Sequence, residues 1–357
     1  MKLEPIILDI GRAFLKTHFT ELDKINDLKL EPVENPFGLF SKNTKSTFKL
    51  SGTFLDKSGN EISFSFFMKA ARENELLASK LVSLRAGSII PEIYASYPLD
   101  NRGDVFLVFT KYVENSKSLW YLINSLKVRS GALQEHHYYA NEILKTIASK
   151  LAAVHYLLSA DWLKQNNQYS CFKVLHEEDI AETITKGITF LKRDYTKNNM
   201  KAFDPDNYLV NSIERYKEPI CRAICEYPFH GLVHGDMQIS NIIWQPENQS
   251  IFYFIDWNHA FIGPQILDLY AFAADSIDKT FIDAYLKVSS ELYQIEIAVN
   301  EMDYYLVNAI IYQSLRLVSQ SADLLDFHKD SNSELAAGII ETLLKRIITY
   351  LEKLERL

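Results

Sequence analysis

The segment of residues 234–256 constrains the fold of this chain more than any other. Two short apolar runs, 242–244 and 251–255, flank a turn-rich spacer, and this pattern predicts a β-hairpin. In an antiparallel pair, the residue before the first strand and the residue after the second strand lie at the same open end. We therefore expect Asn241 and Asp256 to be neighbours in space.

Three side chains of this segment have the chemistry of a magnesium site. Asp236 follows a glycine in a tight turn that leads into Asn241, and Asp256 ends the second apolar run. Carboxylate and amide oxygens are ligands that a hard cation such as Mg²⁺ prefers. Because phosphoryl transfer needs both a metal and a carboxylate, the segment predicts that chemistry.

Length, composition and charge set the broad class of protein. A chain of 357 residues can form two domains or one bilobed domain, and 47% hydrophobic content predicts a globular protein. A net charge of −8 without a basic stripe argues against nucleic-acid binding. No apolar run approaches the roughly 18 residues of a membrane span, and residues 1–19 predict an amphipathic helix, not a signal peptide. We expect a cytoplasmic protein without a membrane partner, as a monomer or a homodimer.

The cysteines predict no disulfide framework and no zinc site. Cys171, Cys221 and Cys225 are too few for a disulfide scaffold and fit a reducing compartment. Cys221 and Cys225, with His230 and His234, superficially resemble zinc ligands. The gap between the two pairs is far shorter than a zinc finger requires, and His234 belongs to the turn that carries Asp236.

The hydrophobic pattern predicts a small β-rich part followed by a larger helical part. Strands are expected at 28–33, 45–55, 62–70, 91–94 and 104–109, and helices at 72–85, at 136–158, through the insert 161–228, and from 267 onward. The expected fold class is therefore α+β and bilobed. We expect a mostly-β nucleotide-binding lobe with one helix at 1–112 and a mostly-α catalytic and substrate-binding lobe at 113–357.

Four motifs in order resemble the aminoglycoside phosphotransferase and choline kinase family, the small-molecule branch of the protein-kinase-like fold. They are an HGDxxxxN loop at 234–241, an IDW motif at 255–257, a GPxxxDL stretch at 263–269 and an LAxxH helix end at 151–155. With Lys69 at the end of the third expected strand, they span most of the chain. The resemblance implies a protein-kinase-like fold.

The resemblance also implies a role for each polar residue. Asp236 would accept the proton of the acceptor hydroxyl, and Lys69 would contact the α- and β-phosphates of ATP. Asn241 and Asp256 would hold Mg²⁺. The backbone of segment 110–113, through Lys111 and Val113, would form a hinge that pairs with the adenine.

A carboxylate from the helix after the third strand would keep Lys69 extended. Glu73 and Glu75 both qualify, and we favour Glu73 because it shares a helix face with Leu76 and Leu77.

Three further residues are expected to be structural. Asp268 is expected to cap a helix N-terminus and, by the resemblance, to brace the HGD loop. His155 and His234 are expected to be buried scaffold residues.

The chain departs from the family pattern inside the HGD loop, where Gln238 and its neighbours replace a frequent second histidine and a proline-glycine pair. It also lacks a GxGxxG segment, and Gly38 is the single glycine of the expected phosphate loop.

The function implied is transfer of the γ-phosphate of ATP to a hydroxyl of a small molecule, by direct in-line attack. Acidic residues at 177–182 and 296–303 favour an amino sugar, such as an aminoglycoside, as the acceptor. Choline, ethanolamine, homoserine or a thiosugar are alternatives, as is a non-catalytic relative of the spore-coat type. The sequence does not decide between ATP and GTP, because base selection depends on hinge geometry.

Overall fold

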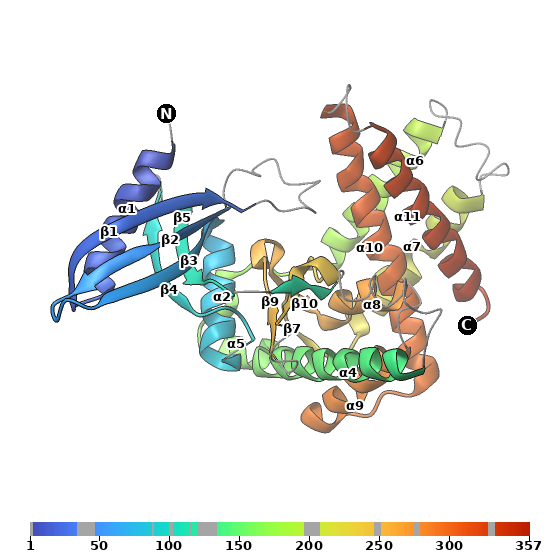
Figure 1. Cartoon of the computed structure of the whole chain (residues 1–357). Coiled ribbons are helices and arrows are strands. Elements are labelled where there is room, and N and C mark those ends of the chain that lie inside the picture. The colour runs from blue at the N-terminus through green and yellow to red at the C-terminus, as the bar shows by residue number, and fades with distance from the viewer. Residues whose placement is uncertain are drawn as a thin grey trace. The chain divides into compact units, whose positions relative to one another are not determined.

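The chain folds into two compact units (Figure 1). One comprises Met1–Arg129 with Ser240–His259, and the other Ser130–Ile239 with Ala260–Leu357. The computed structural model describes residues 3–33, 47–87, 89–99, 103–113, 116–119, 134–195, 208–245, 251–274, 279–327 and 333–357. The expected phosphate loop at 35–43 lies outside these residues. The functional boundary expected at residue 112 stays a prediction.

The first unit is built on a five-stranded antiparallel sheet. Its strands are β1 (Leu22–Pro32), β2 (Thr47–Asp56), β3 (Glu61–Arg72), β4 (Ile93–Pro98) and β5 (Val105–Lys111), in the order β1-β2-β3-β5-β4. β1 begins six residues before the expected strand. Its apolar residues do not keep a spacing of two, because the β1–β2 pairing is irregular between Leu22 and Lys24 and between Ile25 and Asp27.

Two helices pack on opposite faces of this sheet. α1 (Leu3–His18) places Phe14 in one core with Leu107 and Phe109 of β5. α2 (Glu73–Ala86) packs Leu76 against Val108, the β5 residue between those two. Because successive strand residues point to opposite faces, this alternation separates the helices. α1 confirms the amphipathic helix expected at residues 1–19, so this lobe has two helices where the expected architecture counted one.

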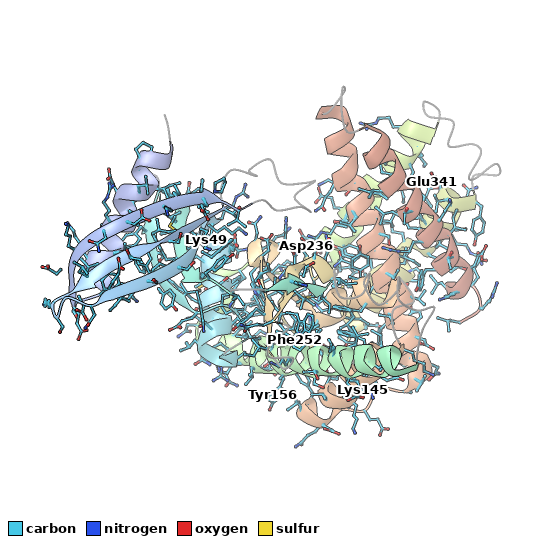
Figure 2. All side chains as sticks on the ribbon, viewed as in Figure 1. Lys49, Lys145, Tyr156, Asp236, Phe252 and Glu341 are labelled. Atoms are coloured by element: carbon cyan, nitrogen blue, oxygen red, sulfur yellow. The ribbon has the colours of Figure 1, made fainter. Side chains whose placement is uncertain are left out.

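The expected hairpin forms, and it belongs to the first unit. β8 (Ile242–Trp244) pairs antiparallel with β9 (Phe252–Phe254), and β6 (Lys117–Ser118) pairs with the other edge of β8. Phe252, which is labelled in Figure 2, is fully buried, and so is Phe254. The Phe254 amide donates to the Ile89 carbonyl at 2.7 Å, so the chain after α2 is tied to the hairpin.

The second unit is mostly helical. Its helices are α4 (Gln134–Leu157), α5 (Ala160–Gln165), α6 (Glu177–Tyr195), α7 (Tyr208–Glu226), α8 (Tyr270–Ala274), α9 (Lys279–Tyr293), α10 (Val299–Phe327) and α11 (Ser333–Leu354). α6, α7, α10 and α11 pack together, and α4 packs against α9. On α4, Lys145 and Tyr156 are exposed (Figure 2), whereas Ile147 and Leu151 are buried. Among the helices that the structure describes, none has the length and apolarity to cross a membrane.

One short sheet in the second unit positions the HGD loop. β7 (His230–Val233) pairs antiparallel with β10 (Phe261–Pro264). β7 runs directly into the loop, and β10 runs into the 3₁₀-helix η5 (Gln265–Leu269), which carries Asp268. The pairing of Val233 with Phe261 therefore brings the HGD loop close to the GPxxxDL stretch, which is about thirty positions further along the chain.

Candidate active site

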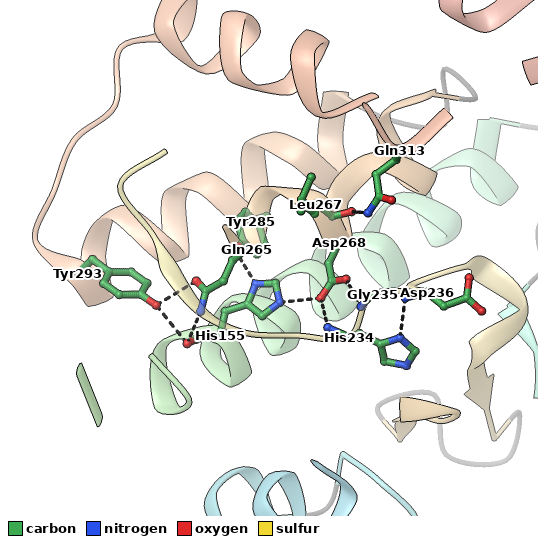
Figure 3. Close-up of polar contacts among 10 residues, drawn as sticks. All are labelled: His155, His234, Gly235, Asp236, Gln265, Leu267, Asp268, Tyr285, Tyr293 and Gln313. Carbon is green, nitrogen blue, oxygen red and sulfur yellow. Dashed lines mark hydrogen bonds and ion pairs between the residues drawn. The ribbon is translucent and has the colours of Figure 1, made fainter. Parts of the chain in front are cut away.

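The turn at residues 234–238 holds Asp236 by several hydrogen bonds, and Figure 3 shows the one between its amide and His234. Gly235 has a φ of 78°, a left-handed conformation that glycine adopts without steric cost. The Asp236 amide donates to His234 Nδ1 at 3.3 Å, and the Gln238 amide donates to the Asp236 carbonyl at 2.8 Å. The Asp236 side chain is half-buried. The turn therefore fixes the backbone on which this carboxylate is presented.

Gln238 is a site residue to which the sequence analysis gave no role. Its Nε2 donates to Asp236 Oδ1 at 2.6 Å, so this departure from the family pattern contacts the predicted base directly. A signal was available, because an amide side chain two residues after an acid in a tight turn can reach back to it. We interpret Gln238 as a residue that orients the Asp236 carboxylate.

Asp268 braces the turn, as expected from the resemblance (Figure 3). Its Oδ2 accepts the His234 amide at 2.7 Å, and its Oδ1 accepts the Gly235 amide at 3.0 Å. The expected N-cap role was wrong. Asp268 lies inside η5, whose N-cap is Pro264, and its carboxylate oxygens accept from the turn and from His155 instead.

His155 and His234 are both fully buried, which confirms their expected position in the scaffold. His155 Nε2 lies 3.1 Å from Asp268 Oδ2, and its Nδ1 lies 2.7 Å from the Tyr285 hydroxyl. Burial raises the pKa of Tyr285 well above its ordinary value, so the phenol keeps its proton and can donate it to Nδ1. The Nε2 proton then points to Asp268, and one chain of hydrogen bonds links α9 to the turn.

Lys69 bridges two carboxylates within the first unit. Its Nζ lies 2.7 Å from Glu75 Oε1 and 2.7 Å from Asp256 Oδ1. Burial acts to lower the pKa of Lys69, but the two carboxylates and their hydrogen bonds outweigh burial and raise it. Lys69 is therefore held charged and extended from β3, with 24% of its side chain exposed.

The preference for Glu73 as the partner of Lys69 was wrong, because Glu75 is the partner. Glu73 is the first residue of α2 and is exposed, whereas Glu75 is 7% exposed and shares a buried face with Ala78 and Val82. A rotation of 200° separates the two positions on an α-helix, so they cannot point to the same side. Spacing alone did not reveal which side of α2 faces the sheet.

The two glutamates provide a matched pair of variants. We expect Glu75→Gln to lower kcat/KM for ATP by about tenfold or more, because Lys69 loses one of its two carboxylate partners. Glu73→Gln removes the same charge from an exposed position and should leave kcat/KM unchanged. Steady-state kinetics with varied ATP measure both. Equal effects of the two variants would contradict the assignment of Glu75.

Asn241 and Asp256 lie at the same end of the hairpin, as expected. The amide of Ile255 donates to the Asn241 carbonyl at 2.9 Å, one residue before Asp256. Asp256 has a φ of 69°, a conformation that aspartate tolerates better than most residues and that often marks a functional position. Both side chains are half-buried, so their oxygens are not sealed in the core.

The oxygen donors of Asn241 and Asp256 fit Mg²⁺ in kind. Hard cations bind carboxylate and amide oxygens, and Mg²⁺ commonly takes one or two protein carboxylates together with phosphate oxygens. In the described part of the chain, no group of three or more His, Cys, Asp or Glu side chains could hold a metal by itself.

The expected hinge lies at the end of β5. The Lys111 amide donates to the Glu92 carbonyl at 2.8 Å, so that backbone donor is already used within the first unit. Val113 follows two residues later and is 9% exposed. Nucleotide pairing by Lys111 and Val113 stays a prediction.

Cys221 and Cys225, which superficially resemble half of a set of zinc ligands, both lie on α7. Burial raises the pKa of Cys221 to about 11, and burial also raises the pKa of Cys225. Both are therefore protonated thiols near neutral pH, in the form that binds metals poorly.

Part of the chain is similar to a known protein family. Residues 192–300 match the profile of a family described as the phosphotransferase enzyme family, and this segment includes the HGD loop and the IDW motif. No curated protein matches the chain.

Several solved structures share the fold over nearly the whole chain. A candidate aminoglycoside phosphotransferase from Ralstonia eutropha is 13% identical, with 97% of this chain and 98% of that chain covered and a TM-score of 0.61. Spectinomycin phosphotransferase in its AMP-bound complex is 13% identical, with 94% of this chain and 96% of that chain covered and a TM-score of 0.57. A choline/ethanolamine kinase family protein from Mesorhizobium loti is 12% identical, with 96% of this chain and 98% of that chain covered and a TM-score of 0.53.

The expected bilobed α+β fold of the protein-kinase-like type is confirmed by these structures. The family match and the shared fold together confirm the resemblance to the aminoglycoside phosphotransferase and choline kinase family. The partial family match agrees with the expected class of enzyme, a small-molecule phosphotransferase.

Proposed function

We propose that the protein transfers the γ-phosphate of ATP to a hydroxyl group of a small molecule. The observation that carries this proposal is the double ion pair of Lys69 with Glu75 and Asp256. In protein-kinase-like folds, phosphoryl transfer requires an ion pair between a strand lysine and a helix carboxylate, together with a carboxylate that binds Mg²⁺.

In the proposed reaction, Asp236 accepts a hydrogen bond from the acceptor hydroxyl and takes its proton as the oxygen attacks the γ-phosphorus. Gln238 holds the carboxylate in place through Oδ1. Lys69 contacts the α- and β-phosphates, and Asn241 and Asp256 would hold Mg²⁺. Bound Mg²⁺ would supply charge neutralisation on the phosphate oxygens.

Two of the acidic residues that favoured an amino sugar, Asp179 and Glu182, have structural partners of their own. Asp179 accepts from Lys173 at 2.6 Å, and Glu182 lies 2.7 Å from Lys186 one turn along α6. Acids in the first turn of a helix also stabilise its positive end. These residues therefore give weaker support to a cationic acceptor than their number suggested.

We keep an amino sugar as the first acceptor to test. A spectinomycin phosphotransferase structure with ADP and spectinomycin shares the fold at 11% identity, with a TM-score of 0.54. Choline and ethanolamine follow, because the Mesorhizobium loti relative by fold is a choline/ethanolamine kinase family protein.

The test of the function is acceptor-dependent formation of ADP by the purified protein with ATP and Mg²⁺. The panel should contain spectinomycin and other amino sugars, choline, ethanolamine, homoserine and a thiosugar. We expect one class to be phosphorylated on a hydroxyl, as seen by mass spectrometry of the product. Nucleotide binding without transfer to any acceptor would favour the non-catalytic alternative.

Mg²⁺ is expected to increase the affinity for ADP, and we expect Asp256→Asn to reduce this increase by about tenfold or more, because a charged ligand of the metal is lost. Asparagine tolerates the left-handed backbone at this position, so the fold should persist. Calorimetric titration of ADP with and without Mg²⁺ measures the effect. Asp23→Asn, at an exposed position of β1, is the control. An unchanged Mg²⁺ dependence would exclude Asp256 from the metal site.

A further inference from the structure

Arg316 of α10 reaches the turn that presents Asp236. Its Nη1 donates to the Gly235 carbonyl at 2.8 Å and to Gln313 Oε1 at 3.1 Å. Gln313 is itself fixed, because its Nε2 donates to the Leu267 carbonyl at 3.1 Å (Figure 3). The guanidinium group is therefore anchored one residue before Asp236.

The two contacts leave one edge of the guanidinium group without a partner. A guanidinium has five N–H donors, and the two on Nη1 are the ones used here. Within the part of the chain that the structure describes, Nε and Nη2 of Arg316 have no hydrogen-bond partner. These two nitrogens form the edge that binds two oxygens of a carboxylate or phosphate side by side.

The positive charge of Arg316 also has no carboxylate in ion-pair contact among the described residues. On the neighbouring helix α6, the Asp179 carboxylate is paired with Lys173 and with the His176 amide. Tyr312, one turn earlier on α10, is a neutral phenol, because burial raises its pKa more than Arg316 lowers it. A half-buried cation without a counter-charge gains free energy when an anion binds.

We propose that Arg316 forms an oxyanion subsite for the phosphoryl group during its transfer to the acceptor. This inference rests on the proposed function. The bond from the acceptor oxygen to the γ-phosphorus forms while the bond to the β,γ-bridging oxygen breaks, and ADP keeps that electron pair. The hydroxyl proton goes to Asp236, and Arg316 exchanges no proton. Its free edge binds two of the three equatorial oxygens, over which the transition-state charge is spread.

The first test measures binding directly. Inorganic phosphate is titrated by calorimetry into the protein saturated with ADP, so that the nucleotide site is filled. We expect Arg316→Gln to weaken phosphate binding at least about tenfold, since the charge is lost while an amide donor remains for the Gly235 carbonyl. Arg346→Gln is the matched control, because Arg346 is a half-buried arginine that packs on Tyr270 of α8. Unchanged phosphate binding in Arg316→Gln would overturn the subsite.

The second test separates the subsite from a brace of the turn. For Arg316→Ala we expect kcat to fall on the order of 10²-fold with little change in acceptor KM, and added guanidinium ion to restore part of it. A lowered free energy of unfolding with no rescue and intact phosphate binding would mean that Arg316 only supports the turn. If the wild-type protein phosphorylates no acceptor, but phosphate binding depends on Arg316, the proposed function fails and the subsite remains.

Discussion

Asp236→Asn is expected to lower kcat for phosphoryl transfer by about 10²- to 10⁴-fold, the range that a positioned general base contributes. Asparagine keeps an oxygen that can accept from Gln238 Nε2, so the turn should keep its geometry while the proton acceptor is lost. ATP affinity should be unchanged, because the carboxylate acts on the acceptor hydroxyl and not on the nucleotide. Steady-state kinetics and calorimetric titration of ATP measure the two quantities.

Asp283→Asn is the control for this result, because Asp283 is an exposed carboxylate of α9 in the same unit. A kcat for Asp236→Asn close to that of the wild-type protein would show that another group takes the proton. A loss of ATP affinity equal to the loss of kcat would instead indicate a defect in folding.

The second large effect is expected for Asp268→Ala, which should destabilise the protein by about 3–5 kcal/mol. The carboxylate is 1% exposed and accepts the His234 and Gly235 amides, so its removal leaves two buried N–H groups without an acceptor. His155 Nε2 loses its partner as well. Each buried donor left unpaired costs about 1–3 kcal/mol, a large share of an ordinary folding free energy of 5–15 kcal/mol.

Urea unfolding followed by circular dichroism measures this loss. Asp283→Ala provides the exposed control, for which the unfolding midpoint should not move. If Asp268→Ala unfolds at the wild-type midpoint, the turn is held by other contacts, of which the Arg316 hydrogen bond to the Gly235 carbonyl is the first to examine.

The elements with regular patterns were predictable. β3 alternates through Phe64, Phe66 and Met68, whose side chains are buried on one face, and the structure places the strand within two residues of the expectation. The hairpin around residues 242–254 was predictable because its spacer contains turn residues between two apolar runs. The start of β1 was not predictable, because pairing irregularities break the period of two that reveals a strand.

Some residues of the site were also predictable from local patterns, and others were not. Asn241 and Asp256 could be placed together because hairpin pairing is local and fixes its own ends. The choice between Glu73 and Glu75 depended on the rotation of α2 about its axis, which packing on the sheet decides. The contact of Gln238 with Asp236 depended on the path of a turn, and that of Arg316 on the packing of a helix 81 positions away.

The sequence by itself determined the chemical groups of the site and their order, because an HGD turn, an IDW motif and a strand-end lysine appear in the residues as written. Only the tertiary structure decided which groups touch. Glu75 and Asp256 meet on Lys69, Asp268 meets the turn amides, and Arg316 meets the Gly235 carbonyl. The physical reason is that each of these contacts joins separate elements. Their distance follows from how helices and sheets pack and not from spacing along the chain.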